Sequence, residues 1–469
     1  MNVPLASAAV TEAGLAVHQV PLSTTLLFSA VLVGLITCLA LEEKLHAKKS
    51  LIAGCFAVVS LLMGAGFSLL PVGPLVNVFG EPMPLPVYIP AIDWGVIAII
   101  LGSSIFVDAT SRSGLFTWIA IKLTKASKGE PRRLLWYYGG MTVLFSAVLN
   151  NVTAMIIVGS LSAVSLERLG RRDKLLGFLV VEGLLTNVGG LLTLISSVPN
   201  IIIGTAADIS FVRFFVVAGP YVAVVTVITL WLGARRFEIG ALKDDRERAE
   251  ALEKVSAFDE NDGIESRGFF FFGATMTCLF VLTIATTSVL PGISDLGMGF
   301  VALAFAAIML LRFKHEVETF YQGVDWDLLG FFAALFVVIN VMEHAQVLAL
   351  LGRGLEHLIA LGDVAGTGAL LIATAGFSSL TDNIPLAAMM AKILGNLGTP
   401  SDSQLWWSVV FGANLGGNIT PIGSASTLVA VTIIHKQKLE LSFVDFVIKA
   451  APYAAVQLAL ATAYVLIFL

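Results

Sequence analysis

Two short polar segments interrupt long apolar runs and carry the residues best suited to chemistry. The segment TDNIP (residues 381–385) sets a carboxylate, an amide and a proline side by side, and NNVT (residues 150–153) sets two amides in a similar place. Burying an ionisable side chain in apolar surroundings is costly, so Asp382 is a functional-site candidate. A carboxylate flanked by amides suits Na⁺ or H⁺. The alternative interpretation is structural: Asp382 or Asn383, and Asn150 or Asn151, would cap the helices that follow.

Two further segments carry paired glycines, TNVGGLLTLISSVPN (residues 186–200) and ANLGGNITPIGSAST (residues 413–427). Glycines let the backbone leave helical geometry, and the freed carbonyls with Asn, Ser and Thr oxygens could coordinate a small cation. The amino ends of the half-helices could instead hold an anion, and close helix packing would also explain the glycines. The candidate ion-binding residues of the four segments are Asn150, Asn151, Thr153, Asn187, Thr193, Ser197, Asp382, Asn383, Asn414, Thr420 and Ser424.

One more acidic residue, Glu182, lies just before the first glycine pair inside the same apolar run. A carboxylate at this depth could relay protons, and pairing with a neighbouring polar group is an equally good explanation. Both interpretations stay open.

Composition indicates a polytopic membrane protein. Hydrophobic residues make up 57% of the 469-residue chain and charged residues 13%, and the mean hydropathy is +0.90. Several apolar runs have the length needed to span a hydrocarbon core. The sequence contains no G-x-x-x-x-G-K-[ST] phosphate loop, no catalytic dyad and no basic aromatic surface. We therefore expect neither an enzyme nor a nucleic-acid binder, and no cofactor beyond transported ions.

The distribution of basic residues predicts the topology of the chain. Lys44, Lys48 and Lys49 follow the first apolar run, which places the amino terminus outside and this loop in the cytoplasm. The charged stretch 235–267 is predicted to be a solvated cytoplasmic linker between two halves, residues 1–234 and 268–469. We expect a multi-pass protein of the cell membrane, embedded in the lipid bilayer.

The apolar run 134–168 is too long for one crossing. It has basic residues at both ends, and 35 residues at about 1.5 Å each would reach about 52 Å. A re-entrant hairpin that turns at residues 149–153 explains both facts, provided that protein or a water-filled cavity surrounds its tip.

An internal repeat gives the strongest structural signal. Asp93-Trp94 recurs as Asp325-Trp326, and LNNVTAMI recurs as TDNIPLAAM, both 232 positions later. TNVGGLLTLISS recurs as ANLGGNITPIGS after 227 positions. The charge count gives the two copies opposite orientations. The sequence therefore predicts an all-α fold of two inverted-topology repeats, each with a re-entrant hairpin and a broken transmembrane helix, and places the binding site between them at the midplane.

These paired motifs resemble the ion transporter superfamily. SAVLNNVTAMIIVG with TNVGGLLTLISSVPNIII, and SSLTDNIPLAAMMAK with ANLGGNITPIGSAS, are similar to the ArsB/NhaD group, which includes NhaD-type sodium/proton antiporters, and to the P proteins. The resemblance implies hairpin tips at the binding site, a homodimer and an elevator-like motion. The positions that match are Asn150, Asn151, Thr153, Asn187, Asp382, Asn383 and Asn414. P-protein-like members tend to have an acid where this chain has Asn150, and a Gly-Asp-Pro-like turn where it reads SSVPN.

Two functions from different substrate classes follow. The first is a sodium/proton antiporter in which Na⁺ and H⁺ compete for Asp382, the transported-metal site. The second is an ion-coupled anion permease for dicarboxylate, citrate or arsenite, in which amides, hydroxyls and helix amino ends hold the substrate. The carboxylate at the second tip favours the antiporter. The first tip has amides only, so the anion permease stays an alternative.

Overall fold

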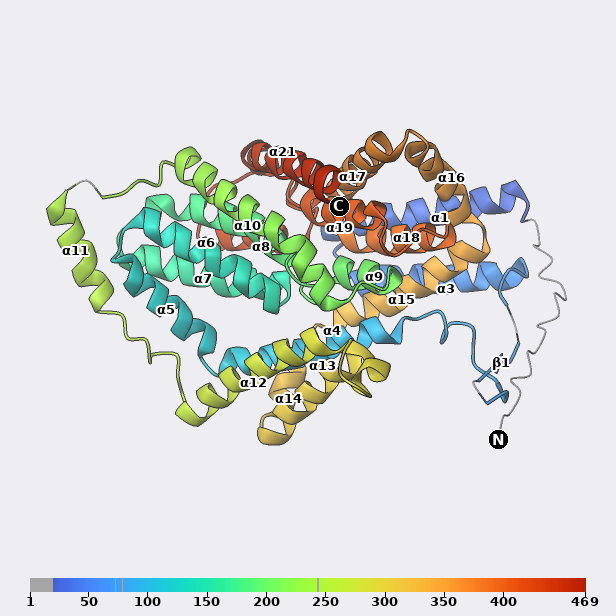
Figure 1. Ribbon diagram of the computed structural model, residues 1–469, viewed down its shortest axis with the longest axis horizontal. Helices are drawn as coiled ribbons and strands as arrows, with labels where there is room; N and C mark the ends of the chain where they lie inside the picture. Colours follow the sequence, from blue (N-terminus) through green and yellow to red (C-terminus); the bar gives the residue numbers. More distant parts are fainter. Residues whose placement is uncertain (1–19, 72, 78, 243) are drawn as a thin grey trace.

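The protein is almost entirely helical (Figure 1). The computed structural model describes residues 20–71, 73–77, 79–242 and 244–469. A short antiparallel sheet pairs β1 (Leu75–Val76) with β2 (Pro82–Met83). Nine helices of this described part are long and apolar enough to cross a membrane: α1 (Leu22–Ala40), α3 (Lys49–Gly66), α4 (Trp94–Arg112), α10 (Phe211–Arg236), α12 (Arg267–Thr286), α13 (Ile293–Arg312), α15 (Trp326–His344), α17 (Asp363–Leu380) and α21 (Phe443–Phe468). The predicted all-α polytopic membrane protein is confirmed.

Seven α-helices of the first half recur in the same order in the second half. The pairs are α4 with α15, α5 (Leu115–Ser127) with α16 (Val347–Ile359), α6 (Pro131–Val148) with α17, α7 (Asn151–Arg168) with α18 (Asn383–Asn396), α8 (Leu175–Gly190) with α19 (Gln404–Gly416), α9 (Val198–Ala206) with α20 (Ala425–Lys436), and α10 with α21. Four of these pairs have equal lengths of 19, 13, 18 and 26 residues. The opposite orientation of the halves in a membrane stays a prediction.

Local chemistry explains why the Asp-Trp pairs recur. The side chains of Asp93 and Asp325 each accept a hydrogen bond from the backbone N–H three residues later, at 3.1 and 2.9 Å, and so begin α4 and α15. The indole N–H of Trp94 and of Trp326 donates to the backbone carbonyl five residues earlier, at 3.1 and 3.0 Å. Both pairs are therefore helix starts.

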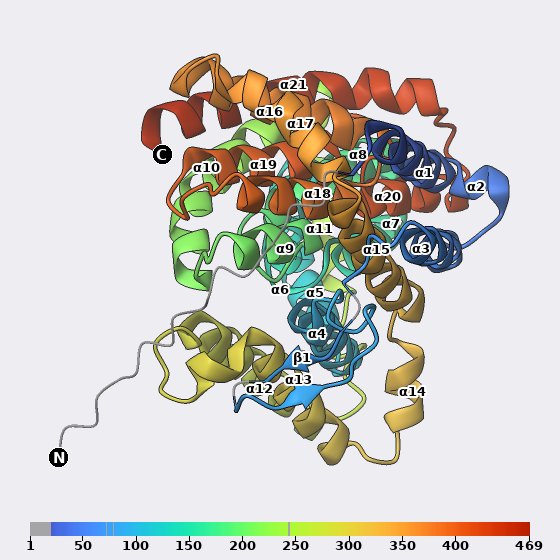
Figure 2. The same cartoon turned by 90° about the vertical axis from the view of Figure 1, so that its right-hand side faces the viewer.

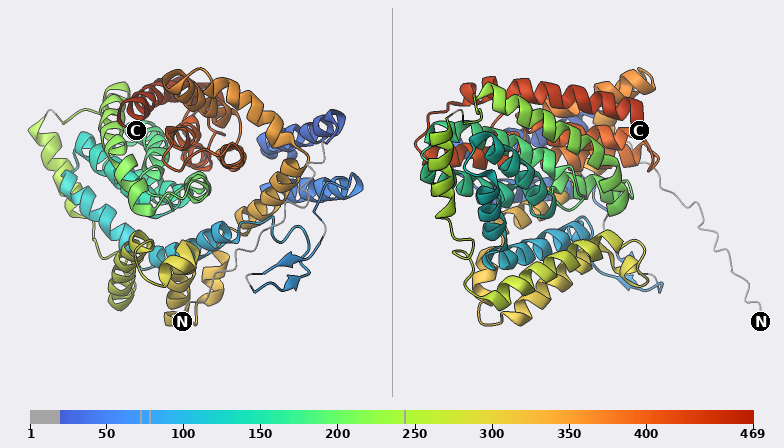
Figure 3. Two further views of the ribbon diagram at one scale, coloured as in Figure 1. Left: turned by 45° about the vertical axis from the view of Figure 1, so that its right-hand side comes forward. Right: turned by 60° about the vertical axis from the view of Figure 1, so that its left-hand side comes forward.

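The helices form two groups. Figure 3 shows one group, α1, α3, α4, α12, α13 and α15, as an arc beside the other group, which contains α6–α10 and α17–α21. We call these groups the arc and the inner bundle. Within the arc α3 packs on α15 and α13 packs on α4, so each half supplies a helix to the other, and Figure 2 shows α1, α3 and α15 side by side. Gly102 of α4 is essential to this packing, because a Cβ there would lie 2.4 Å from the backbone of Ala302.

The remaining helices are short. They are α2 (Glu42–Leu45), η1 (Arg172–Lys174), α11 (Asp245–Ser256) and α14 (Val317–Gln322). Helix α11 lies in the charged linker and packs against α5. The linker boundaries and the two-half division stay predictions, and residues 1–19 of the predicted first half, with the predicted outside position of the amino terminus, lie outside the described residues.

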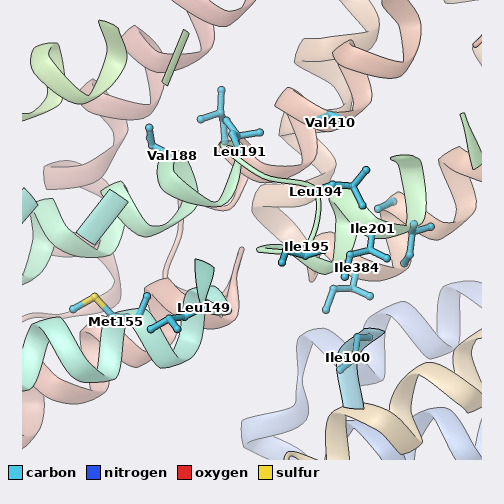
Figure 4. Close-up of a cluster of buried hydrophobic side chains, with 14 of the residues drawn as sticks. Ile100, Leu149, Met155, Val188, Leu191, Leu194, Ile195, Ile201, Ile384 and Val410 are labelled. Atoms are coloured by element: carbon cyan, nitrogen blue, oxygen red, sulfur yellow. The ribbon is translucent and has the colours of Figure 1, made fainter. Parts of the chain in front are cut away.

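A shared apolar core surrounds both hairpins. Figure 4 shows buried side chains from the first tip (Leu149), from the chain between α8 and α9 (Leu194), from the second tip (Ile384) and from α4 (Ile100). These side chains belong to one continuous cluster of buried residues. Buried apolar side chains therefore border the polar tips, and a polar group enclosed by such side chains is costly unless it is paired.

Candidate functional site

Both predicted hairpin tips are helix breaks with a side-chain cap on the second helix. The chain leaves α6 and α17 through an extended residue, Leu149 or Thr381, and re-enters a helix one residue later. Asn150 Oδ1 accepts from the backbone N–H of Thr153 at 2.8 Å, and Asp382 Oδ1 accepts from the backbone N–H of Ile384 at 3.1 Å. The structural interpretation of both residues is therefore correct, and it uses only one oxygen of Asp382.

The second oxygen of Asp382 binds a lysine of the arc. Lys49, the first residue of α3, donates from Nζ to Asp382 Oδ2, and Glu42 Oε1 lies 3.9 Å from the same ammonium. By its position in the sequence, Lys49 is explained as one of the basic residues of a cytoplasmic loop. Nothing local in the sequence links it to Asp382, because the two residues are 333 positions apart.

The two helix breaks contact each other through reciprocal pairs. Asn187 Nδ2 donates to Ser424 Oγ at 2.8 Å, and Asn414 Oδ1 accepts from Ser197 Oγ at 2.9 Å. Since Asn187 matches Asn414 and Ser197 matches Ser424 in the repeat, each amide binds the serine of the other half. Reciprocal contacts of this kind are expected between parts related by a two-fold axis.

Asn187 also joins the first tip to the second break. Its Oδ1 accepts from Ser426 Oγ at 3.0 Å and from Asn151 Nδ2 at 3.4 Å, while its Nδ2 reaches Asn418 Oδ1 at 2.9 Å. The side chain of Asn187 is fully buried. A single amide therefore couples the first tip to three positions of the opposite break, Asn418, Ser424 and Ser426.

Threonine hydroxyls hold each hairpin against the break of its own half. Thr193 Oγ1 donates to the Ala147 carbonyl at 2.5 Å, and Thr420 Oγ1 donates to the Ser379 carbonyl at 2.6 Å. These contacts match in the repeat. Thr193 and Thr420, predicted as ion-binding residues, thus serve the assembly of the site.

A cavity of about 750 Å³ lies between the inner bundle and the arc. The predicted site residues that line it are Asn150, Asn151, Thr153, Asn187, Ser197, Asn383 and Ser424. The amino ends of α7, α9, α18 and α20 therefore reach its wall. The arc contributes charged side chains of both signs, among them Lys48, Lys49, Asp325 and Asp327.

Asp382 lines a second, much smaller cavity of about 40 Å³. Lys49, Glu42 and Ser424 line both cavities, so the two spaces adjoin. Asn414, Thr193 and Thr420 line neither of them. The structure thus brings seven predicted residues to the large cavity and places Asp382 beside it.

Glu182 lies away from both cavities. It is fully buried in α8, where its Oε1 accepts from Ser162 Oγ of α7 at 2.5 Å. Its Oε2 has no hydrogen-bond partner among the residues that the structure describes. Pairing with a neighbouring polar group is therefore observed, and the proton relay stays a prediction.

Two asparagines of the site were missed although both lie in the glycine-paired segments. Asn200 Oδ1 accepts from Asn414 Nδ2 at 2.8 Å, and Asn418 Nδ2 donates to Gln457 Oε1 at 2.8 Å. All four amides of these contacts are fully buried or nearly so. An asparagine in an apolar run was the signal that could have found them, since a buried amide needs partners.

The comparisons with known proteins agree on a transporter. The citrate transporter family model matches residues 56–412. An uncharacterized transporter of Mycobacterium tuberculosis is 30% identical over 80% of this chain and 86% of its own length. A 46 kDa membrane protein of Mycobacterium leprae is 31% identical over the same shares. The mouse P protein is 25% identical over 91% of this chain and 61% of its own length.

Two solved transporter structures share the fold. The YdaH transporter of Alcanivorax borkumensis, described as having an unusual topology, superposes with a TM-score of 0.57 at 16% identity and covers 90% of this chain and 98% of its own. MtrF of Neisseria gonorrhoeae gives a TM-score of 0.55 at 16% identity, with 95% of each chain covered. The family match and the relatives show that the chain belongs to the citrate transporter family and is a secondary transporter, not an enzyme.

Proposed function

We propose that the protein carries a small carboxylate anion across the membrane, coupled to a cation. The observation that carries this proposal is the wall of the large cavity, where the amino ends of α7, α9, α18 and α20 meet. Helix amino ends carry partial positive charge and unpaired N–H groups, which favour anions. Amide and hydroxyl groups beside them supply further hydrogen-bond donors.

The size of the cavity also favours an organic anion. The carboxylates that line the large cavity, Glu42, Asp108, Asp325 and Asp327, lie on the side of α2, α4 and α15. The helix amino ends on the opposite wall are therefore the part that would hold an anion. The volume of about 750 Å³ falls within the usual range of small-molecule pockets and far exceeds a bare alkali ion. The matching family model is described as a citrate transporter, and a polycarboxylate suits several converging helix ends.

Sodium/proton antiport is the second candidate, and Asp382 is the observation that favours it. Its carboxylate stands at a hairpin tip, next to a cavity large enough for a small ion. Na⁺ and H⁺ would compete for this carboxylate, and Glu182 would offer a second protonation site. In the first candidate the same carboxylate holds the coupling cation.

A substrate panel in proteoliposomes tests the proposal. We expect uptake of labelled citrate or succinate, driven by a Na⁺, Li⁺ or proton gradient, and no comparable flux in empty vesicles. Asn151→Ala, which removes an amide from the cavity wall, lowers the uptake through a higher KM. Cation-for-proton exchange without flux of citrate, succinate or arsenite would instead select the antiporter.

The assembly and orientation belong to the same proposal. We propose two inverted halves, which would place the large cavity near the midplane of the cell membrane. The amino terminus would lie outside and the linker in the cytoplasm, and the protein would form a homodimer. The reciprocal contacts of Asn187 and Asn414 support a two-fold relation of the halves. Labelling of cysteines introduced in the linker, from either side of the membrane, tests the orientation.

A further inference from the structure

Helix α18 is tied to the arc at both of its ends. At the amino end Asp382 pairs with Lys49 of α3. At the carboxyl end Lys392 Nζ lies 3.2 Å from Glu343 Oε2 of α15, and Asn396 Nδ2 donates to Glu343 Oε1 at 3.2 Å. The side chain of Asp382 is 8% exposed, against 51% for Lys392. Because exposed pairs contribute little, the pair at the tip is the stronger tie.

The first hairpin has no matching tie. Asn150 stands where Asp382 stands in the repeat, and its amide is exposed and caps α7. Among the described residues no ion pair joins α7 to the arc. Among the described residues, the second hairpin thus forms ion pairs with the arc and the first hairpin does not.

The surroundings of Asp382 offer room and ligands for a free cation. The cavity of about 40 Å³ beside it exceeds the space that one water molecule needs. Its wall holds the carboxylates of Asp382 and Glu42, the hydroxyls of Thr381 and Ser424, and the ammonium of Lys49. Oxygen ligands of this kind suit a hard cation such as Na⁺.

We propose that Lys49 is a tethered cation that competes with a free monovalent cation for Asp382. When Lys49 occupies the carboxylate, the second hairpin is held on the arc. When the free cation binds, it keeps the carboxylate neutralised, so Lys49 leaves without exposing a buried charge. The hairpin is then released from α3. This inference rests on the proposed coupling to a cation and names the residue that regulates it.

Competition has a measurable consequence for cation affinity. A ligand that must displace an internal competitor binds with a raised apparent Kd, which equals the intrinsic Kd divided by the fraction of sites that the competitor leaves open. Removing the ammonium of Lys49 should therefore tighten the binding of Na⁺. A tenfold change corresponds to about 1.4 kcal/mol, a modest value for a part-buried ion pair.

The test measures Na⁺-dependent thermal stabilisation of the purified full-length protein. Na⁺ and Li⁺ are titrated against N-methylglucamine, a cation too large for the small cavity. We expect the half-saturating Na⁺ concentration of Lys49→Gln to fall about tenfold below that of the wild type. Lys49→Arg keeps the positive charge and should stay near the wild type. Lys49→Gln combined with Asp382→Asn should show no Na⁺-specific shift.

Lys44→Gln is the matched control, because it removes an exposed lysine of the same loop that lines neither cavity. Equal half-saturation in Lys49→Gln and the wild type would overturn the proposal, as would the absence of any Na⁺ or Li⁺ shift in both proteins. If Lys49→Gln is not monodisperse, Lys49→Met serves in the same titration with the same expected tightening. Failure of the proposed anion transport is seen separately, as absent citrate and succinate uptake by wild-type vesicles.

Discussion

The two hairpins share their construction, and the capping side chain gives them different charges. Both turn through one extended residue, both begin their second arm with a side-chain cap, and both are held to their own break by a threonine hydroxyl. Asn150 has a neutral amide at the cap, while Asp382 adds a carboxylate that reaches Lys49. A cap needs only one oxygen, so the second oxygen of Asp382 is free to serve ion binding without loss of the fold.

The largest effect should come from equalising the tips with Asp382→Asn. The amide keeps the cap of α18 but removes the negative charge that Lys49 and a coupling cation share. We expect a loss of at least ~100-fold in cation-coupled uptake, because ion–carboxylate interactions of about 3 kcal/mol correspond to two powers of ten. Uptake by proteoliposomes measures the effect, and size-exclusion chromatography checks folding.

The reverse change, Asn150→Asp, tests the other hairpin. It keeps the cap of α7 and adds a charge to a hairpin that, among the described residues, makes no ion pair with the arc. We expect a smaller loss of uptake than with Asp382→Asn. Equal losses in the two variants would show that the tips are equivalent and would contradict the assignment of cation coupling to the second hairpin.

A second contrast separates the reciprocal amides, Asn187 and Asn414. Each is fully buried and its removal leaves several polar atoms without partners, so Asn187→Ala and Asn414→Ala should each lower the free energy of unfolding by roughly 2–4 kcal/mol. Only Asn187 lines the large cavity. We therefore expect Asn187→Ala to raise the KM for the anion as well, while Asn414→Ala changes mainly stability.

Thermal unfolding in detergent and uptake over a range of anion concentrations distinguish these effects. A raised KM in Asn414→Ala at unchanged stability would mean that the second break contacts the substrate directly. Asn414 would then have the binding role that is assigned here to Asn187.

The threonines should show the symmetry of the hairpins. Thr193→Val and Thr420→Val each remove one hydroxyl that binds a hairpin carbonyl, at 2.5 and 2.6 Å. Each should lower the free energy of unfolding by about 1 kcal/mol, and by similar amounts in the two halves. Thermal unfolding of the two variants side by side measures this. A threefold difference would show that one hairpin carries more of the stability.

Local sequence patterns predicted the elements of the site well. The tips, the breaks and the repeat could be read because caps and glycine pairs act over a few residues, and because the same patterns occur at a constant spacing. Asn151, Asn187 and Ser424 line the large cavity, and their part in binding stays a prediction. The repeat identified the tips and breaks as pairs, which a single motif could not do.

The partners across the molecule could not be predicted in the same way. The contact of Lys49 with Asp382 depends on how the arc packs against the inner bundle, and no periodic pattern encodes that. The loop lysine also satisfied the positive-inside rule, which gave it a sufficient explanation. Asn200 and Asn418 were missed because partners in the opposite half decide which amides of a segment meet.

The smallest effect concerns the carboxyl ends of α7 and α18. The linker contacts this end of α7, as α15 contacts this end of α18. The Arg168 guanidinium of α7 lies 5.0 Å from the ring centroid of Phe258. Glu260 in turn accepts hydrogen bonds from Lys122 and Lys125 of α5, and these hold the pKa of Glu260 at about 2, below its usual 4.5.

A lowered pKa in the docked state means that ionised Glu260 favours docking of the linker. This contribution is complete above about pH 4.5 and is lost as the pH falls from 4.5 towards 2. Since the pair is solvent-accessible, salt should weaken it.

We expect pepsin to cleave the linker slowly at pH 4 and much faster near pH 2. Glu260→Gln should remove most of this difference, because its docking no longer depends on ionisation at position 260. An unchanged pH profile in that variant would place the docking energy in the Phe258 contact, and the far end of α7 would then be held by packing where α18 is held by charge.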